Sequence, residues 1–188
     1  HPDTLSRMKT VAVIYSQLGR VNEALQLQEL LVELSKKFLG EDQPSTLSRE
    51  QSLISKFLKM GRYKEAVQLG EPLVSFSKKV LGKEHPDTLA RIQSLIFTYL
   101  KLERYIEALD LGEPLLEVSQ RILGEEHPDT LSRMKTVAAA YSQLGRYNEA
   151  LQLQEPLVEL SKKSLGDEHP KTLSRIDDMK YTRSQLGK

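Results

Sequence analysis

The stretch that decides the fold is Leu81-Gly82-Lys83-Glu84-His85-Pro86-Asp87-Thr88-Leu89. It recurs almost unchanged at residues 123–131 and in altered form at 39–47 and 165–173, and its second half occupies residues 1–5. The His-or-Gln position therefore falls at 1, 43, 85, 127 and 169, a period of 42 residues without slippage. A fixed period of this size is typical of an array of stacked repeats. We number the positions of a repeat as columns 1 to 42, with His85 in column 1.

The 188 residues therefore contain four full repeats and the first half of a fifth. We expect one array with repeats at 1–42, 43–84, 85–126 and 127–168, followed by a half-repeat at 169–188. Columns 12 and 15 are apolar or aromatic in the full repeats but become Lys180 and Arg183 in the last one, which predicts a capping helix with a polar outer face. Because the chain opens at His1, in the middle of a joint, we expect it to continue upstream.

Each joint predicts the end of one helix and the start of the next. Gly82 suits the left-handed conformation just past a helix end. Pro86 suits a first helical turn, and Asp87 meets the positive end of the helix dipole there. Between joints, two segments at about columns 3–18 and 22–39 carry apolar residues along one helical face. The sequence thus predicts an all-α fold with two helices in each repeat.

The joint histidines raise the alternative of a metal site. Residues in the same column of stacked repeats lie about one helix-packing distance apart, roughly 8–10 Å, which is too far to share an ion. Gln43 also occupies the histidine column. We therefore favour a role in the turn and expect neither a metal nor a cofactor.

Two further columns predict how the helices bend and which groups bond between them. Proline follows glutamate inside the second helix at Pro72, Pro114 and Pro156, where it is expected to kink or break the helix and so set curvature. Column 7 is arginine in every repeat. We expect each arginine stem to pack on the core and its head to meet a carboxylate in column 29 or 42, with an anion-binding ladder as the alternative. The column 7 residues are Arg7, Arg49, Arg91, Arg133 and Arg175.

The turn between the two helices carries a resemblance to a known family. Its residues are Tyr141-x-x-Leu144-Gly145-Arg146-Tyr147-Asn148-Glu149-Ala150-Leu151, which resemble the tetratricopeptide pattern. The long joint resembles the 42-residue variety found in kinesin light chains and, more closely, arrays on fungal and bacterial NOD-like signalling proteins. The resemblance implies a right-handed superhelical α-solenoid of stacked antiparallel helix pairs, with the first helix of each repeat on the concave side.

The resemblance also implies a function. We expect a protein–protein interaction scaffold that binds a peptide or protein segment in its concave groove, as the sensor or recruitment part of a larger cytoplasmic signalling protein. The alternative is a structural or oligomerisation segment that packs against its parent domains or another copy. We expect no enzyme, because most polar residues recur in every repeat and the column 35 serines have no base beside them by spacing.

Charge and composition limit the classes of molecule that the chain is expected to bind. Lys and Arg total 27 against 26 Asp and Glu, so no charge excess calls for nucleic acid. The longest apolar run, residues 11–15, is far too short to span a membrane. Repeats one and four match at 35 of 42 positions, and repeat one is more apolar at several of the seven differences, including Val13, Ile14 and Phe38. We expect these to contact an upstream element or a neighbouring copy.

A candidate site follows from the helical period. Columns 6, 9, 13 and 16 fall on one side of the first helix, largely opposite the core columns, and we call this side the groove face. In the tetratricopeptide arrays that the chain resembles, these columns line the groove. A short peptide with one or two apolar anchors and an acidic end is the ligand expected there; the alternative is that Leu58, Phe97 and Leu100 pack between neighbouring helices. The predicted peptide-binding residues are Lys9, Gln51, Ser55, Leu58, Gln93, Phe97, Leu100 and Lys135.

Overall fold

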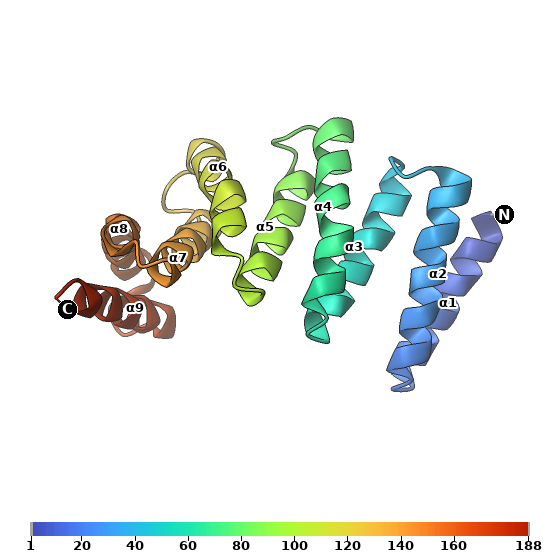
Figure 1. The fold of residues 1–188 in the computed structure, drawn as a ribbon, viewed down its shortest axis with the longest axis horizontal. Helices are drawn as coiled ribbons and strands as arrows, with labels where there is room; N and C mark the ends of the chain where they lie inside the picture. The colour runs from blue at the N-terminus through green and yellow to red at the C-terminus, as the bar shows by residue number, and fades with distance from the viewer. Residues whose placement is uncertain (1, 188) are drawn as a thin grey trace. The chain divides into compact units, whose positions relative to one another are not determined.

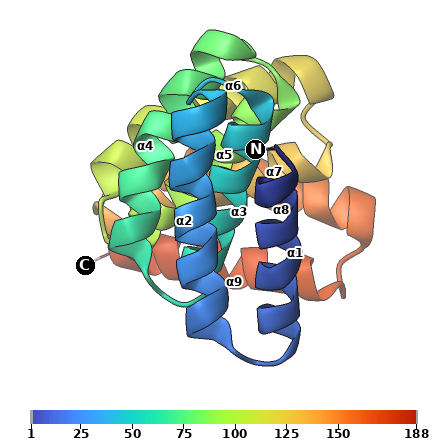
Figure 2. The same ribbon diagram turned by 90° about the vertical axis from the view of Figure 1, so that its right-hand side faces the viewer.

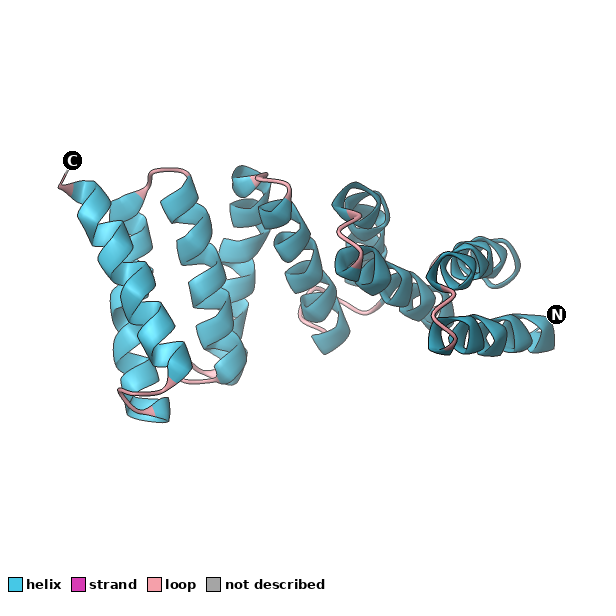
Figure 3. Ribbon diagram, turned by 90° about the horizontal axis from the view of Figure 1, so that it is seen from below, coloured by secondary structure: helices cyan, strands magenta, loops and turns pink. Residues whose placement is uncertain are grey.

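The structure is a computed structural model that describes residues 2–187. These residues form nine α-helices and contain no strand (Figures 1 and 3). The predicted all-α fold class is therefore confirmed, with two helices in each full repeat. The helices are α1 (Pro2–Gln17), α2 (Val21–Leu39), α3 (Pro44–Lys59), α4 (Tyr63–Val80), α5 (Pro86–Lys101), α6 (Tyr105–Leu123), α7 (Pro128–Gln143), α8 (Tyr147–Leu165) and α9 (Pro170–Leu186).

The chain forms two compact units that divide within α5, the first at residues 1–91 and the second at 92–188. In the first unit, α1 and α2 lie side by side and antiparallel, joined by a tight turn (Figure 2). Helices α2, α3 and α4 then pack in chain order. In the second unit, α6 to α9 pack in the same order. Both units therefore have the packing of an α-solenoid built from helix pairs.

The helix starts confirm the turn role of the joint histidines. Helices α3, α7 and α9 begin at the joint proline, one residue before the predicted start. The Nδ1 atoms of His85, His127 and His169 accept hydrogen bonds from the backbone N–H two residues later, over 3.1–3.2 Å. The histidine thus caps the helix, satisfying one of the N–H groups that a helix start leaves without a partner.

The joint glycines differ in one respect from the prediction. Gly40, Gly124 and Gly166 have positive φ angles of 107°, 90° and 92°, as expected just past a helix end. Their ψ angles of 151°, 163° and 161° are extended, so the predicted left-handed helical conformation is wrong. This region of the backbone map is essentially restricted to glycine. The chain leaves each of these helices abruptly because it must reach the next proline within a few residues.

The turn between the two helices of a repeat also uses a positive φ angle. Gly61 and Gly145 have φ angles of 71° and 72°. Glu103 stands at the same column in the third repeat and also has a positive φ, of 59°. The turn geometry is therefore kept where the sequence departs from glycine, and Glu103 bears the steric cost that its Cβ brings.

The interior prolines do not break their helices. Helices α4, α6 and α8 continue through Pro72, Pro114 and Pro156, so the break that was one predicted outcome is absent from them. Each proline is exposed, and so is the residue four positions earlier, whose carbonyl loses its helical partner. That carbonyl lies on the water-facing side of the helix, where solvent satisfies it.

The predicted apolar columns form the core. In the first unit, Leu47, Ile54, Phe57 and Leu73 pack with residues of α2 in one cluster. In the second unit, Leu131, Met134, Val137 and Leu157 pack with residues of α6 in another. Burying a side chain of this size contributes about 1.5–3 kcal/mol, so the helix pairs are stable only when stacked on their neighbours. None of the described helices is long and apolar enough to cross a membrane.

The column 7 arginines bond across the joint to the second helix of the preceding repeat. Among the described residues, the heads of the last four arginines bond to serines and not to the carboxylates of column 29 or 42, so that prediction is wrong for them. Each arginine from the second repeat onward instead donates from Nη1 to a buried serine in column 35, whose own Oγ donates to the carbonyl one turn earlier. The pairs are Arg49 with Ser35, Arg91 with Ser77, Arg133 with Ser119 and Arg175 with Ser161.

The reason for this pairing is the inward direction of the arginine. Arg91, Arg133 and Arg175 are buried at the joint, and the desolvation lowers the pKa of each guanidinium below its usual value. The column 29 carboxylates meet other groups. Glu155, for example, lies 2.8 Å from Arg183. Arg7, at the first column 7, is exposed.

Candidate functional site

In the first unit, the predicted site residues share one face of α3 but are not all free. Gln51, Ser55 and Leu58 are half-buried, and the Ser55 Oγ donates to the Gln51 carbonyl over 2.9 Å. Leu58 packs against the core cluster, so the packing alternative applies to it at least in part. Gln51 Oε1 is buried with no hydrogen-bond partner among residues 2–187. Lys9 lies separately on α1 and is exposed.

In the second unit, α5 presents an exposed aromatic ring. Phe97 is 43% exposed, and Lys101 Nζ lies 5.3 Å from its ring centroid. Gln93 lies one turn before Phe97 on the same side of the helix, and its Oε1 is also buried without a partner in the described part of the chain. Leu100 packs against the core cluster. Phe97 is thus the predicted apolar anchor that remains accessible.

Lys135 on α7 is already engaged. Its Nζ lies 3.0 Å from Asp178 Oδ2 and donates to Ser174 Oγ over 3.1 Å, both on α9. Its charge is therefore shared with a carboxylate of the same chain. An acidic peptide end would have to compete with Asp178 for it.

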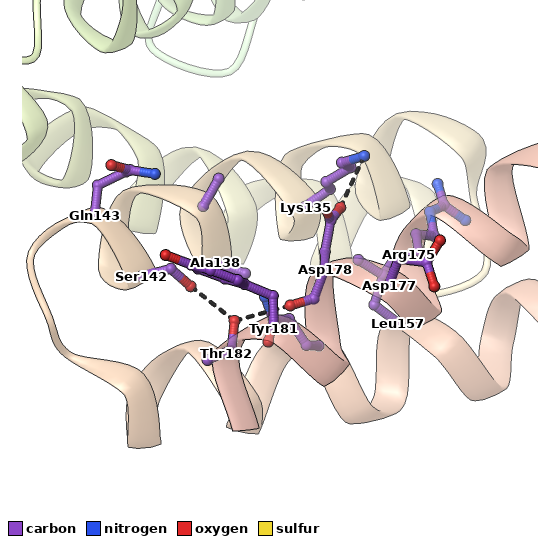
Figure 4. Close-up of a pocket in the computed structure, with 12 residues that line it drawn as sticks. Lys135, Ala138, Ser142, Gln143, Leu157, Arg175, Asp177, Asp178, Tyr181 and Thr182 are labelled. Atoms are coloured by element: carbon purple, nitrogen blue, oxygen red, sulfur yellow. Dashed lines mark hydrogen bonds and ion pairs between the residues drawn. The ribbon is translucent and has the colours of Figure 1, made fainter. Parts of the chain in front are cut away.

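A pocket of about 290 Å³ lies at this point between α7 and α9 (Figure 4). Helix α7 supplies Lys135, Ala139 and Ser142 to the pocket. These are columns 9, 13 and 16, so the pocket opens on the groove face. From α9, Tyr181 reaches across the opening, while Thr182 bonds to Ser142 over 3.1 Å between their hydroxyls.

The floor of the pocket comes from α8. Leu157 and Gln154 line it, and Gln154 is only 5% exposed. The Gln154 Oε1 has no hydrogen-bond partner among the described residues. Column 28 is glycine in the third repeat, where a Cβ on Gly112 would lie 3.1 Å from Val137. A glutamine therefore occupies a position in the fourth repeat that the third repeat keeps free of any side chain.

Some charged and polar groups around the pocket have bonding partners in the chain, and others do not. Arg175 is directed to Ser161, and Lys135 to Asp178 and Ser174, so both cations have partners. Asp177 also lines the pocket, is exposed, and has no partner within residues 2–187. Two of the polar groups without a partner among the described residues, Asp177 and Gln154 Oε1, are hydrogen-bond acceptors.

Sequence reasoning found one side of this pocket and missed the other. The column pattern predicted Lys135, but Gln154, Asp177 and Thr182 were not identified. Two signals in the sequence pointed to them. The side chain in column 13 is smaller in the fourth repeat, where Ala139 replaces the Phe97 of the third, and this opens space. Column 28 changes from glycine in the third repeat to glutamine in the fourth.

The arrangement suits binding and offers little for chemistry. The column 35 serines, such as Ser77, are fully buried and bonded to arginine, so they are not available as nucleophiles. Among the described residues, no group of three or more His, Asp or Glu side chains could hold a metal ion.

Comparison with known protein families identifies the repeats. Residues 88–155 match one tetratricopeptide repeat model, and residues 4–45 and 57–87 match a second. A crystal structure of nearly identical TPR-like repeats from a putative kinesin light chain of Podosopora anserina is 32% identical, with a TM-score of 0.82 over 100% of this chain and 89% of that chain. The chain belongs to the tetratricopeptide repeat family.

Two further solved structures are similar to this tetratricopeptide array. A variant of the same Podosopora anserina repeats gives a TM-score of 0.83 at 32% identity, over 100% of this chain and 88% of that chain. BtubC from P. vanneervenii shares the fold at 17% identity, with a TM-score of 0.66 over 98% of this chain and 82% of that chain. No curated protein matches the chain.

The comparisons confirm the predicted resemblance to kinesin light chain-like repeats. Tetratricopeptide repeats generally serve as protein-interaction scaffolds.

Proposed function

We propose that this tetratricopeptide array is an interaction scaffold that binds a peptide or protein segment along the groove face of its repeats. The observation that carries the proposal is the exposed Phe97 ring on α5. Exposed aromatic side chains in a binding groove are frequent anchors, and a few such residues supply most of the binding energy. Phe97 is therefore the residue whose loss should matter most.

The surroundings of Phe97 support a peptide as the ligand. Gln93 lies one turn away on the same side of α5 and has a carbonyl oxygen without a partner in the described chain. An extended peptide that places an apolar side chain on Phe97 brings its own backbone N–H groups within reach of this helix face. The lysine 5.3 Å from the ring centroid, Lys101, adds a polar rim.

The proposed setting is the sensor or recruitment part of a larger cytoplasmic signalling protein. The resemblance of the joint sequence to arrays on NOD-like signalling proteins supports this setting. In such an arrangement the array selects the partner, and any catalytic step belongs to other domains.

A structural or oligomerising segment is the second candidate, favoured by the apolar surface of the first repeat. Ile14 is 46% and Phe38 63% exposed in the structure. Their exposure fits the prediction that they contact an upstream element or a neighbouring copy. Analytical ultracentrifugation tests contact with a neighbouring copy. A wild-type dimer that dissociates in the double variant Ile14→Ala, Phe38→Ser would favour self-association.

The test of peptide binding does not require the natural partner. Random peptides are selected by display on the immobilised array, and their affinity is measured by isothermal titration. Phe97→Ala should weaken the selected peptides by about 10-fold or more, corresponding to about 1–2 kcal/mol. Circular dichroism verifies that the helices are intact.

The matched control is Ile106→Ala, which truncates another exposed apolar residue, on the second helix of the same repeat and outside the groove face. We expect it to leave peptide affinity unchanged. Equal affinity of the selected peptides for wild type and Phe97→Ala would place the binding surface elsewhere.

A further inference from the structure

We propose that the pocket between α7 and α9 receives a basic side chain, lysine or arginine, of the bound peptide. The proposal rests on the function proposed above, because the pocket opens on the same groove face. It adds a chemical preference that Phe97 alone does not give. Three features of the pocket carry it: its shape, its unpartnered acceptors and its paired cations.

The shape suits one long side chain. A volume of about 290 Å³ is at the lower end of ligand pockets. Ala138, Ala139 and Leu157 give it an apolar wall, against which the methylene stem of a lysine or arginine packs. Tyr181 is 61% exposed at the opening, where its ring face attracts a cation.

Two acceptors of the pocket are open to a hydrogen-bond donor. Gln154 Oε1 is buried without a hydrogen bond in the described chain, a state that is unfavourable for a polar atom. Asp177 supplies a carboxylate at the rim with no partner of its own in residues 2–187. An ammonium or guanidinium group donates to both kinds of acceptor and carries the charge that complements Asp177.

The cations of the pocket argue against an acidic side chain. Lys135 is held by Asp178 and Ser174, as Figure 4 shows for the first of these, and Arg175 is held by Ser161. A carboxylate entering the pocket would have to displace one of these contacts. It would also face Asp177 and Asp178, both of which line the pocket.

The direct test uses N-acetyl-arginine methylamide as the probe and the full ¹⁵N-labelled chain. The expected result is a set of chemical-shift changes at the Gln154 side-chain amide and the backbone amides of Ala139 and Thr182. The citrulline analogue has nearly the same shape but no charge, and it should produce much smaller changes. Asp177→Asn and Gln154→Leu should each weaken the probe by at least about fivefold.

A matched control comes from the first repeat. Gln28 occupies the same column as Gln154, and its Oε1 is likewise buried without a partner in the described chain. Gln28→Leu should leave the arginine probe bound as in wild type. Asp177 is exposed, so Asp177→Asn preserves the fold and remains informative if Gln154→Leu does not fold.

Two outcomes overturn the proposal. One is the absence of shifts at the three reporter residues up to the solubility limit of the probe; the other is an equal response to arginine and citrulline. The result is separable from that for the proposed function. Selected peptides that depend on Phe97 while the arginine probe fails would remove only the basic-residue preference. A probe that binds while the peptides ignore Phe97 would remove the assignment of the peptide-binding face.

Discussion

Arg91 of α5 donates from Nη1 to the Oγ of Ser77 in α4 over 2.7 Å, and both side chains are buried. The serine hydroxyl in turn donates to the Leu73 carbonyl over 2.6 Å. A guanidinium, a hydroxyl and a backbone carbonyl thus form one chain of hydrogen bonds across the joint. Because Arg91 has been removed from water, the serine acceptor compensates for lost hydration.

Ser77→Ala should destabilise the array. The substitution leaves a buried guanidinium donor without its acceptor, which costs about 1–3 kcal/mol. The free energy of unfolding from urea titration, followed by circular dichroism, measures the loss. Ser52→Ala is the matched control, because Ser52 also donates to the carbonyl one turn earlier but is exposed. A Ser77→Ala protein as stable as Ser52→Ala would show that the joint hydrogen bond contributes little.

Glu103→Gly should stabilise the array. Glu103 is exposed and has a φ of 59°, a conformation that costs a residue with a Cβ about 1–2 kcal/mol. Part of this gain is offset by the greater freedom of glycine in the unfolded chain, so the net increase should be about 0.5–1 kcal/mol. Thermal unfolding measures it. The converse variant, Gly145→Glu in the fourth repeat, should lower the melting temperature, and a rise there would contradict the explanation.

Glu50 should make stability depend on pH. Its carboxyl is 2% exposed and lies 2.7 Å from Lys36 Nζ, yet burial outweighs the lysine and raises the pKa of Glu50 above its usual value. A carboxyl with a raised pKa adds stability below its unfolded pKa and loses it as pH rises through the folded pKa. Wild type should therefore gain stability relative to Glu50→Gln as pH falls from 7 toward 4.5. Melting temperatures of both proteins across this range measure the difference.

Glu65 provides a control of opposite sign. Its hydrogen bond with Arg62 lowers the pKa of this carboxyl, so its contribution is present above the unfolded pKa and is lost as pH falls through the folded pKa. Relative to Glu65→Gln, wild type should lose stability under acid. Parallel pH profiles for the two pairs of proteins would refute the burial of Glu50 as the cause.

Deleting residues 169–188 should lower stability and solubility. Helix α9 packs on α8. Its residues Thr172 and Arg175 cover Ser161 of α8, to which both donate hydrogen bonds. Helix α9 also carries the exposed Lys180 and Arg183 in place of apolar residues, and Arg183 bonds to Glu155 at the edge of α8. Urea midpoints and light scattering compare the shortened array with wild type and with a chain that lacks only residues 187–188. An unchanged midpoint for the longer deletion would mean that α9 is not a cap.

The sequence predicted the helices well because their signals are local. Proline at the helix start, glycine past its end and apolar columns at helical spacing each act within one or two turns. The partner of Arg91 could not be predicted in this way. Helical spacing gives the side on which an arginine lies, but the nearest acceptor, Ser77, belongs to the preceding helix and depends on how the two helices pack.

The candidate site was predicted less completely, for a related reason. The columns that form the groove face followed from the helical period, and Phe97 is exposed as a binding residue requires. The pocket depends on space between helices. Ala139 leaves that space and Gln154 lies beneath it, so its volume is a property of three packed helices rather than of any one pattern.

The joint between repeats also determines how such an array changes in length over evolution. Ser77 and Arg91 lie 14 residues apart, as do Ser119 and Arg133. Loss of residues 85–126 would join Ser77 to Arg133 at the same separation, with the histidine, proline and glycine of the joint all retained. Gain or loss of one whole 42-residue repeat would therefore keep the 14-residue separation between serine and arginine at each remaining joint, which makes the repeats interchangeable units of length.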